Sequence, residues 1–192
     1  MFIDKQKLER EYLDEITKIG NLFDTIKVDY CVFGCYALLA HGMRTKQCLD
    51  TIMVISSDNK TKVLEMIFKL NYIIYAVKDN VLKIRKSSKS GDITLDIVLS
   101  IPDDKEFIVN YQSKNLKFPA KMFDQERKEV FGSFMGGKSS RGYFKVAPLE
   151  EIYFTKLNSN QEADISDLEM IKASGKLDVE KLLKLLEKNG MI

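Results

Sequence analysis

Three short stretches of this 192-residue chain carry residue types that could do chemistry together. Gly34 stands between a β-favouring run and a helix-favouring run, where a glycine lets backbone N–H groups and a helix N-terminus approach an anion. Asp50 opens the next β-branched run, beside that turn. Asp96 lies inside the apolar segment Thr-Leu-Asp-Ile-Val-Leu, where a buried charge needs a cation. A phosphate cradle next to carboxylates is the minimum equipment for holding a metal-bound nucleotide.

The elements that must position these residues follow from the spacing of apolar side chains. Around Gly34, the pattern predicts a strand over 30–33, a short helix over 36–40 and a strand over 51–55. Further elements are predicted on both sides: an amphipathic helix over 4–23, a helix over 60–70, a hairpin of 72–77 and 81–85, and a strand over 93–101.

The second half of the chain changes from strands to helices. Residues 102–121 have irregular apolar spacing, which predicts a loop with a short helix. Two strands, 129–135 and 143–147, flank a glycine-rich turn, and helices follow after Pro148, near Asp164 or Ser166, and after Asp178. We expect an α/β (α+β) fold with a mixed sheet flanked by helices: an α/β domain over 1–147 and a C-terminal helical segment over 148–192 packed on it.

The stretch from Tyr30 to Ile55 resembles the nucleotidyltransferase superfamily of DNA polymerase β relatives, in the AbiEii toxin-like branch. Members of that branch read as strand, Gly-Gly or Gly-Ser, Ala-rich helix, His-Gly, Arg-x-Thr-x-Asp-Ile-Asp and an apolar strand. This chain matches with Gly34-Cys35, Ala37 to Ala40, His41-Gly42, Arg44 and Asp50. It departs from the pattern at Cys35, at Lys46 in place of threonine, and at Cys48 in place of the first metal-binding aspartate.

The resemblance assigns roles to particular residues. It makes Asp50 and Asp96 the catalytic carboxylates that would bind Mg²⁺. It places Gly34, Cys35, Arg44 and Lys156 at the nucleotide. The family's lysine on the helix after the last hairpin corresponds to Lys156, and its closing Arg-x-Lys-Asp-x-x-Asp-Leu stretch is matched in part by Asp164, Asp167 and Leu168, with Gln161 and Ala163 at the usual basic positions.

Simpler interpretations stay open for several of these residues. Asp96 also fits an outward-facing position on an edge strand. Lys156 also fits a solvated surface lysine, and Arg44 a structural role. His41 is better interpreted as a packing residue at the end of a helix, because a lone histidine makes a poor metal site.

The segment 132–139 satisfies the phosphate-binding pattern Gly-x-x-x-x-Gly-Lys-Ser, which taken literally predicts a P-loop nucleotidase. That mechanism needs a helix opening at Lys138, whereas Tyr143 and the residues after it favour a strand. We therefore expect a glycine-rich hairpin turn and keep a P-loop NTPase as a minor alternative.

Composition limits the class of protein more than its function. The net charge of +2 implies no polyelectrolyte partner, and three cysteines with one histidine argue against a disulfide framework or a structural zinc site. No apolar run is long enough to span a bilayer, so we expect a cytoplasmic protein without a membrane partner.

Two functions remain for the chain. One is transfer of a nucleoside monophosphate from a metal-nucleoside triphosphate to a hydroxyl of a nucleic acid, a protein or a small molecule, weakened because Cys48 is a poor magnesium ligand. The other is an inactive nucleotidyltransferase-fold module, similar to toxin–antitoxin components, that binds a nucleotide, nucleic acid or partner protein.

Overall fold

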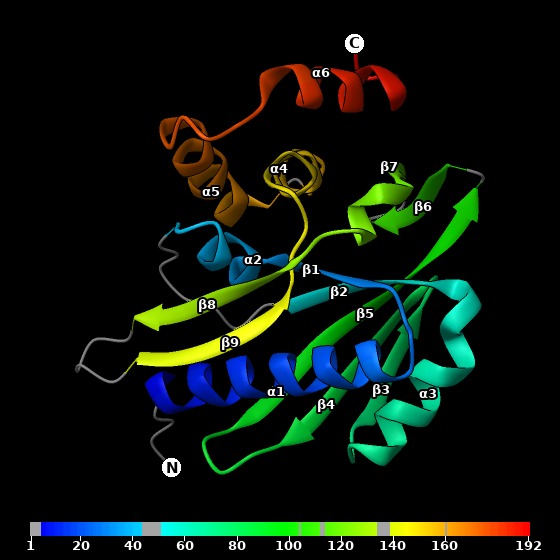
Figure 1. The fold of residues 1–192 in the computed structure, drawn as a ribbon, viewed down its shortest axis with the longest axis vertical. Coiled ribbons are helices and arrows are strands. Elements are labelled where there is room, and N and C mark those ends of the chain that lie inside the picture. Colours follow the sequence, from blue (N-terminus) through cyan, green and yellow to red (C-terminus); the bar gives the residue numbers. More distant parts are fainter. Residues whose placement is uncertain (1–4, 44–50, 104, 112–113, 134–138, 160) are drawn as a thin grey trace.

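The computed structural model describes residues 5–43, 51–103, 105–111, 114–133, 139–159 and 161–192 (Figure 1). The helices are α1 (Lys5–Thr25), α2 (Cys35–Ala40), α3 (Lys60–Lys69), α4 (Leu149–Leu157), α5 (Glu162–Ala173) and α6 (Val179–Lys188), with short 3₁₀ turns η1 (Ser57–Asn59) and η2 (Ala120–Phe123). The strands are β1 (Tyr30–Gly34), β2 (Thr51–Ser56), β3 (Ile73–Lys78), β4 (Val81–Ser87), β5 (Asp92–Asp103), β6 (Glu106–Tyr111), β7 (Lys114–Pro119), β8 (Arg127–Ser133) and β9 (Ser139–Lys145).

The main sheet is mixed, with the order β1-β2-β5-β4-β3, and β6 and β7 extend it beyond the far end of β5. β2 and β5 are parallel, whereas the other pairs in the sheet are antiparallel. β8 and β9 form a separate hairpin that packs against α1 and α2 (Figure 1). This arrangement confirms the expected fold class of a mixed sheet flanked by helices.

The two faces of the main sheet have different neighbours. Side chains alternate between faces along a strand, so Lys86 and Lys83 of β4 lie on opposite faces. Lys86 pairs with Glu15 of α1 at 3.0 Å, so α1 lies on the face opposite Lys83. On the Lys83 face, a small apolar cavity between the sheet, β7 and α4 is lined by Phe33, Ile52, Val54, Val98, Val109, Tyr111, Leu116, Phe118 and Thr155.

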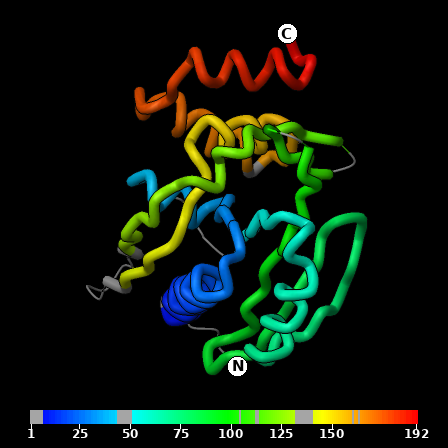
Figure 2. Tube along the Cα trace, turned by 45° about the vertical axis from the view of Figure 1, so that its right-hand side comes forward, coloured from blue at the N-terminus to red at the C-terminus, as the bar shows by residue number. Residues whose placement is uncertain are grey.

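The C-terminal helices lie at the end of the molecule opposite α1, and the tube trace shows the same separation from a second direction (Figure 2). α4 packs on α5, α6 and α2. Lys181 of α6 donates to Glu150 and Glu151 of α4, both at 3.0 Å, and these two glutamates are buried. No helix in the described part of the chain is both long enough and apolar enough to cross a membrane.

Several elements predicted from the sequence are confirmed, with bounds close to the predicted ones. The predicted helix over 4–23 is α1, and the hairpin turning at Asp79-Asn80 is β3–β4. Asp178 caps α6 by accepting a hydrogen bond from the Lys181 N–H.

The expectation for residues 102–121 is wrong in its main part. β5 continues to Asp103, and β6 and β7 form an antiparallel hairpin before the short helix, which is η2. The strand pattern was hidden because this hairpin buries few side chains, chiefly Val109, Leu116 and Phe118. Its stability therefore comes from docking on the sheet and α4 rather than from an alternating apolar run.

Candidate functional site

Gly34 makes the sharp connection between β1 and α2. Its backbone has φ 80° and ψ −156°, a combination that side chains with a Cβ rarely adopt. The next residue, Cys35, begins α2 and is 7% exposed. A glycine is thus required at the position where the sequence predicted a phosphate-approaching turn.

A row of paired residues runs across the sheet next to this turn. Phe33 of β1 pairs with Ile52 of β2, Ile52 pairs with Asp96 of β5, and Asp96 pairs with Lys83 of β4. Neighbouring strands are about 4.8 Å apart, so the Gly34 turn and Asp96 are separated by two strand spacings, about 10 Å. The glycine turn and Asp96 therefore lie along one row across the sheet.

Asp96 is neither buried nor fully solvated. Its carboxylate oxygen Oδ2 accepts a hydrogen bond from Lys83 Nζ at 2.9 Å, and the two side chains are 31% and 40% exposed. The sequence predicted that Asp96 needs a cation, and the structure supplies Lys83. Sequence reasoning missed Lys83 itself, although its position between the buried residues Leu82 and Ile84 indicates that it points to the other face of β4.

Three residues that the resemblance singled out, Arg44, Cys48 and Asp50, lie outside the described residues. The described chain resumes at Thr51, whose neighbour Ile52 is the residue directly beside Asp96. Thr51 is 3% exposed, and its hydroxyl has no hydrogen-bond partner among the described residues.

Lys156 of α4 is tied to two carboxylates of α5. Its ammonium lies 2.5 Å from Asp164 Oδ1 and 2.7 Å from Asp167 Oδ2, and the lysine side chain is 11% exposed. Burial by itself lowers the pKa of Lys156, but the hydrogen bonds to both aspartates outweigh it and raise that pKa above its ordinary value. Three of the four residues matched to the C-terminal part of the family pattern, all except Leu168, thus meet in one cluster.

His41 behaves as the packing residue that the sequence indicated. It ends α2, and its Nε2 lies 2.9 Å from the Ala147 carbonyl oxygen, at the junction between β9 and α4. Burial is the largest influence on His41 and lowers its pKa, although the bond to Ala147 acts in the opposite direction. Lys128 Nζ lies 3.4 Å from the other ring nitrogen, which therefore acts as an acceptor in a neutral imidazole.

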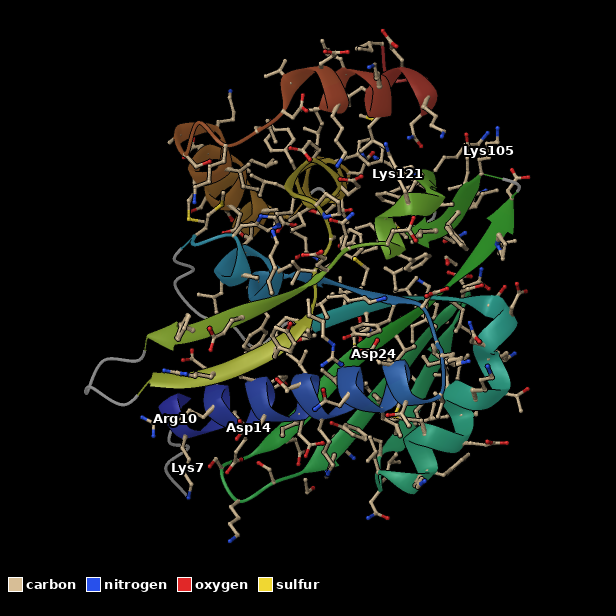
Figure 3. The ribbon with its side chains drawn as sticks, in the orientation of Figure 1. Lys7, Arg10, Asp14, Asp24, Lys105 and Lys121 are labelled. Carbon is tan, nitrogen blue, oxygen red and sulfur yellow. The ribbon has the colours of Figure 1, made fainter. Side chains whose placement is uncertain are left out.

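The glycine-rich segment 132–139 has the context of a hairpin. Ser133 pairs with Ser139 at the end of the β8–β9 ladder, and β9 continues as a strand to Lys145. A P-loop requires a helix at this point. Opposite the tip, Arg127 of β8 anchors the hairpin to α1 through the carboxylate of Asp24, which Figure 3 marks near the end of that helix.

Among the described residues, no group of three histidine, cysteine or acidic side chains gathers around a common point. Asp96 is thus the one carboxylate of the candidate site that the described chain places. Its oxygen is a hard donor of the type that Mg²⁺ prefers, and its exposure leaves room for an ion, so the residue fits the metal that the fold implies.

Known proteins resemble this chain in their three-dimensional structure but not detectably in their sequence. No protein-family model matches the sequence, and neither does any curated protein. The crystal structure of the lincosamide antibiotic adenylyltransferase LnuA with lincomycin bound is similar with a TM-score of 0.56, at 17% identity, over 83% of this chain and 95% of that one.

Two structures of the antibiotic-resistance factor ANT(2'')-Ia are similar as well. The solution structure has a TM-score of 0.57 at 13% identity and covers 94% of this chain and 90% of that one. The crystal structure with adenylyl-2''-tobramycin has a TM-score of 0.55 at 15% identity, over 93% of this chain and 97% of that one.

These likenesses cover between 83% and 94% of this chain and at least 90% of each of the other chains. At such low identity they establish the fold. The AbiEii-type branch of the resemblance remains a prediction. The chain has the nucleotidyltransferase fold.

Proposed function

We propose that the protein binds a metal-nucleoside triphosphate on the open face of its main sheet, which is the face that carries Lys83 and Asp96 and lies opposite α1. The protein then transfers the nucleoside monophosphate to a hydroxyl acceptor. The observation that carries the proposal is the row from the Gly34 turn to Asp96 on a nucleotidyltransferase fold. Asp96 stands on this row with a half-exposed carboxylate, one strand away from the start of β2.

The proposal gives each site residue one task. Backbone N–H groups after Gly34, including that of Cys35, bind phosphate oxygens, and Arg44 adds a bidentate cation. The resemblance pairs Asp50 with Asp96, and we propose the same pairing for this chain. These two carboxylates would hold Mg²⁺, which when bound supplies charge neutralisation for the phosphates.

The reaction needs a hydroxyl acceptor that lies on the sheet beside Asp96. The acceptor oxygen forms a new bond to the α-phosphorus, the bond from that phosphorus to the bridging oxygen of pyrophosphate breaks, and the hydroxyl proton passes to solvent. Lys156 belongs to the proposal as a cation for the departing pyrophosphate on a helix that borders the same face. In the structure it is engaged with Asp164 and Asp167, so its role at the phosphate requires release from one of them.

Within the proposed C-terminal segment over 148–192, α4 borders the face of the sheet that carries Asp96, and α5 and α6 pack on α4. Thr155 of α4 already contacts the apolar cavity that Ile52 and Val98 line. Of the similar structures, LnuA has lincomycin bound, and one ANT(2'')-Ia structure is a complex with adenylyl-2''-tobramycin. For this chain a nucleic acid, a protein or a small molecule each remains an acceptor to be tested.

Two observations favour a second function. Cys48 stands where the pattern has a metal-binding aspartate, and Asp96 already has an ammonium partner. Both features reduce the negative charge that two-metal phosphoryl transfer requires. In this second form the protein binds nucleotide, nucleic acid or a partner protein without turnover.

The test is calorimetric titration of each nucleoside triphosphate, with and without Mg²⁺, together with an assay for released pyrophosphate. We expect metal-dependent binding that Asp96→Asn and Asp50→Asn both abolish, with slow pyrophosphate release by the natural protein. Binding without release would identify the inactive module. Metal-independent turnover that survives both substitutions would place the chemistry elsewhere and end the proposal.

A further inference from the structure

Lys83 is the strongest unassigned feature near the candidate site. It stands directly opposite Asp96 in the β4–β5 ladder, and its ammonium contacts the carboxylate at 2.9 Å. The register that creates this contact follows from the 88–91 turn, which joins β4 to β5 next to the pair Ser87 and Asp92. The pairing of the two backbones is built into the sheet, because separating them would require a shift of the whole ladder, whereas the Lys83 side chain, which is 40% exposed, can rotate.

The neighbouring cations on the sheet are engaged elsewhere. Arg85, the next residue on the same face of β4, lies 3.6 Å from Asp92 and stacks over the Tyr75 ring at 5.7 Å. Lys86 faces α1 and pairs with Glu15. Among the residues that the structure describes, Lys83 is therefore the cation that this part of the sheet directs at the candidate metal ligand.

A lysine in this position acts on a divalent ion in two ways. Its ammonium occupies one oxygen of Asp96, and its charge repels a second cation that approaches the same carboxylate. A triphosphate reverses the balance, because its negative charges attract both the ion and the ammonium. Lys83 should consequently lower the affinity of Asp96 for free metal and raise the affinity of the site for the metal-phosphate complex.

We propose that Lys83 is an internal counter-ion that keeps free divalent metal off Asp96 and admits the metal only as its triphosphate complex. The lysine is a positioning residue: it leaves the carboxylate for the phosphates when the complex binds. Metal and triphosphate binding are then thermodynamically coupled through one side chain, and the coupling is reciprocal. This inference rests on the proposed function, because it assumes that Asp96 is a metal ligand.

The experiment uses the full chain with Mn²⁺ alone and with preformed Mn²⁺-tripolyphosphate, a probe that carries the triphosphate without any base. Calorimetry measures the affinity of each for the natural protein, Lys83→Met, Lys83→Arg and Asp96→Asn. Lys86→Met is the matched control, since it removes a lysine from the same strand on the opposite face. Circular dichroism confirms that each variant is folded.

We expect Lys83→Met to bind Mn²⁺ alone about tenfold more tightly and to bind the complex several-fold more weakly than the natural protein. Lys83→Arg and Lys86→Met should resemble the natural protein for both probes. A merely structural lysine would weaken both together, because a distorted sheet offers a worse site to either ligand.

The experiment distinguishes failure of the counter-ion role of Lys83 from failure of the proposed metal site. If Asp96→Asn abolishes binding of the complex but Lys83→Met changes neither affinity, the counter-ion role is wrong and the proposed metal site stands. If the natural protein and every variant bind neither Mn²⁺ nor its tripolyphosphate complex, the proposed function and the inference fall together.

Discussion

Two lysine–aspartate clusters in this protein use the same chemistry in opposite surroundings. Lys83 and Asp96 lie on the open sheet face with 40% and 31% of their side chains exposed, whereas Lys156 and Asp164 lie between two helices with 11% and 13% exposed. An exposed ion pair contributes little to stability because water screens both charges. A buried cluster mainly holds its helices together, because separating its charges leaves them poorly solvated.

The largest expected effect is loss of stability on breaking the buried cluster. Lys156→Met removes the one cation between Asp164 and Asp167 and should lower the free energy of unfolding by about 3 kcal/mol. Lys83→Met, the matched change on the open face, should alter it by less than about 1 kcal/mol. Urea denaturation followed by circular dichroism measures both. Equal losses would remove the distinction between the two clusters.

A smaller effect is the pH dependence of the same cluster. The pKa of Lys156 is raised from 10.5, so the folded protein holds this proton more tightly than the unfolded chain. The stabilisation is therefore complete below pH 10.5 and declines as the pH rises through the folded value. The difference in unfolding free energy between the natural protein and Lys156→Met should shrink as the pH is raised above 10.5. A constant difference over that range would show that the lysine stabilises by packing alone.

The third effect sharpens the assignment of the open cluster as a metal site. Cys48→Asp restores the carboxylate of the family pattern and should tighten Mn²⁺ binding by up to about tenfold, with Asp50→Asn as the control that abolishes it. The gain should be larger in the Lys83→Met background, because residues that share one ion couple in a double-mutant cycle. Calorimetry of the four proteins measures the cycle. No gain in either background would mean that Cys48 does not adjoin the carboxylates.

The smallest expected effect concerns the lysine of the misleading phosphate-binding pattern. Lys138→Ala should leave the affinity for every nucleoside triphosphate unchanged, because β9 follows it as a strand and offers no helix N-terminus. Fluorescence or calorimetric titration with magnesium and nucleotide suffices. A large loss of binding would bring back the P-loop interpretation and move the nucleotide site away from the main sheet.

Most of the fold was accessible from the sequence because its elements have strong local signals. The apolar spacing of α1, the Asp79-Asn80 turn and the Asp178 cap are each decided by residues within a few positions of one another. The hairpin of β6 and β7 gave no such signal, since its few buried side chains meet partners from distant parts of the chain.

The amino-acid sequence alone determined that Gly34 begins a strand-to-helix turn and that Asp96 requires a cation. Both conclusions follow from local physics: backbone freedom at a glycine and the cost of placing a charge in an apolar strand. Only the tertiary structure decided which cation that is, because the contact depends on the register between β4 and β5. It likewise decided that Lys156 lies between Asp164 and Asp167, since the packing of α4 against α5 brings their charges together.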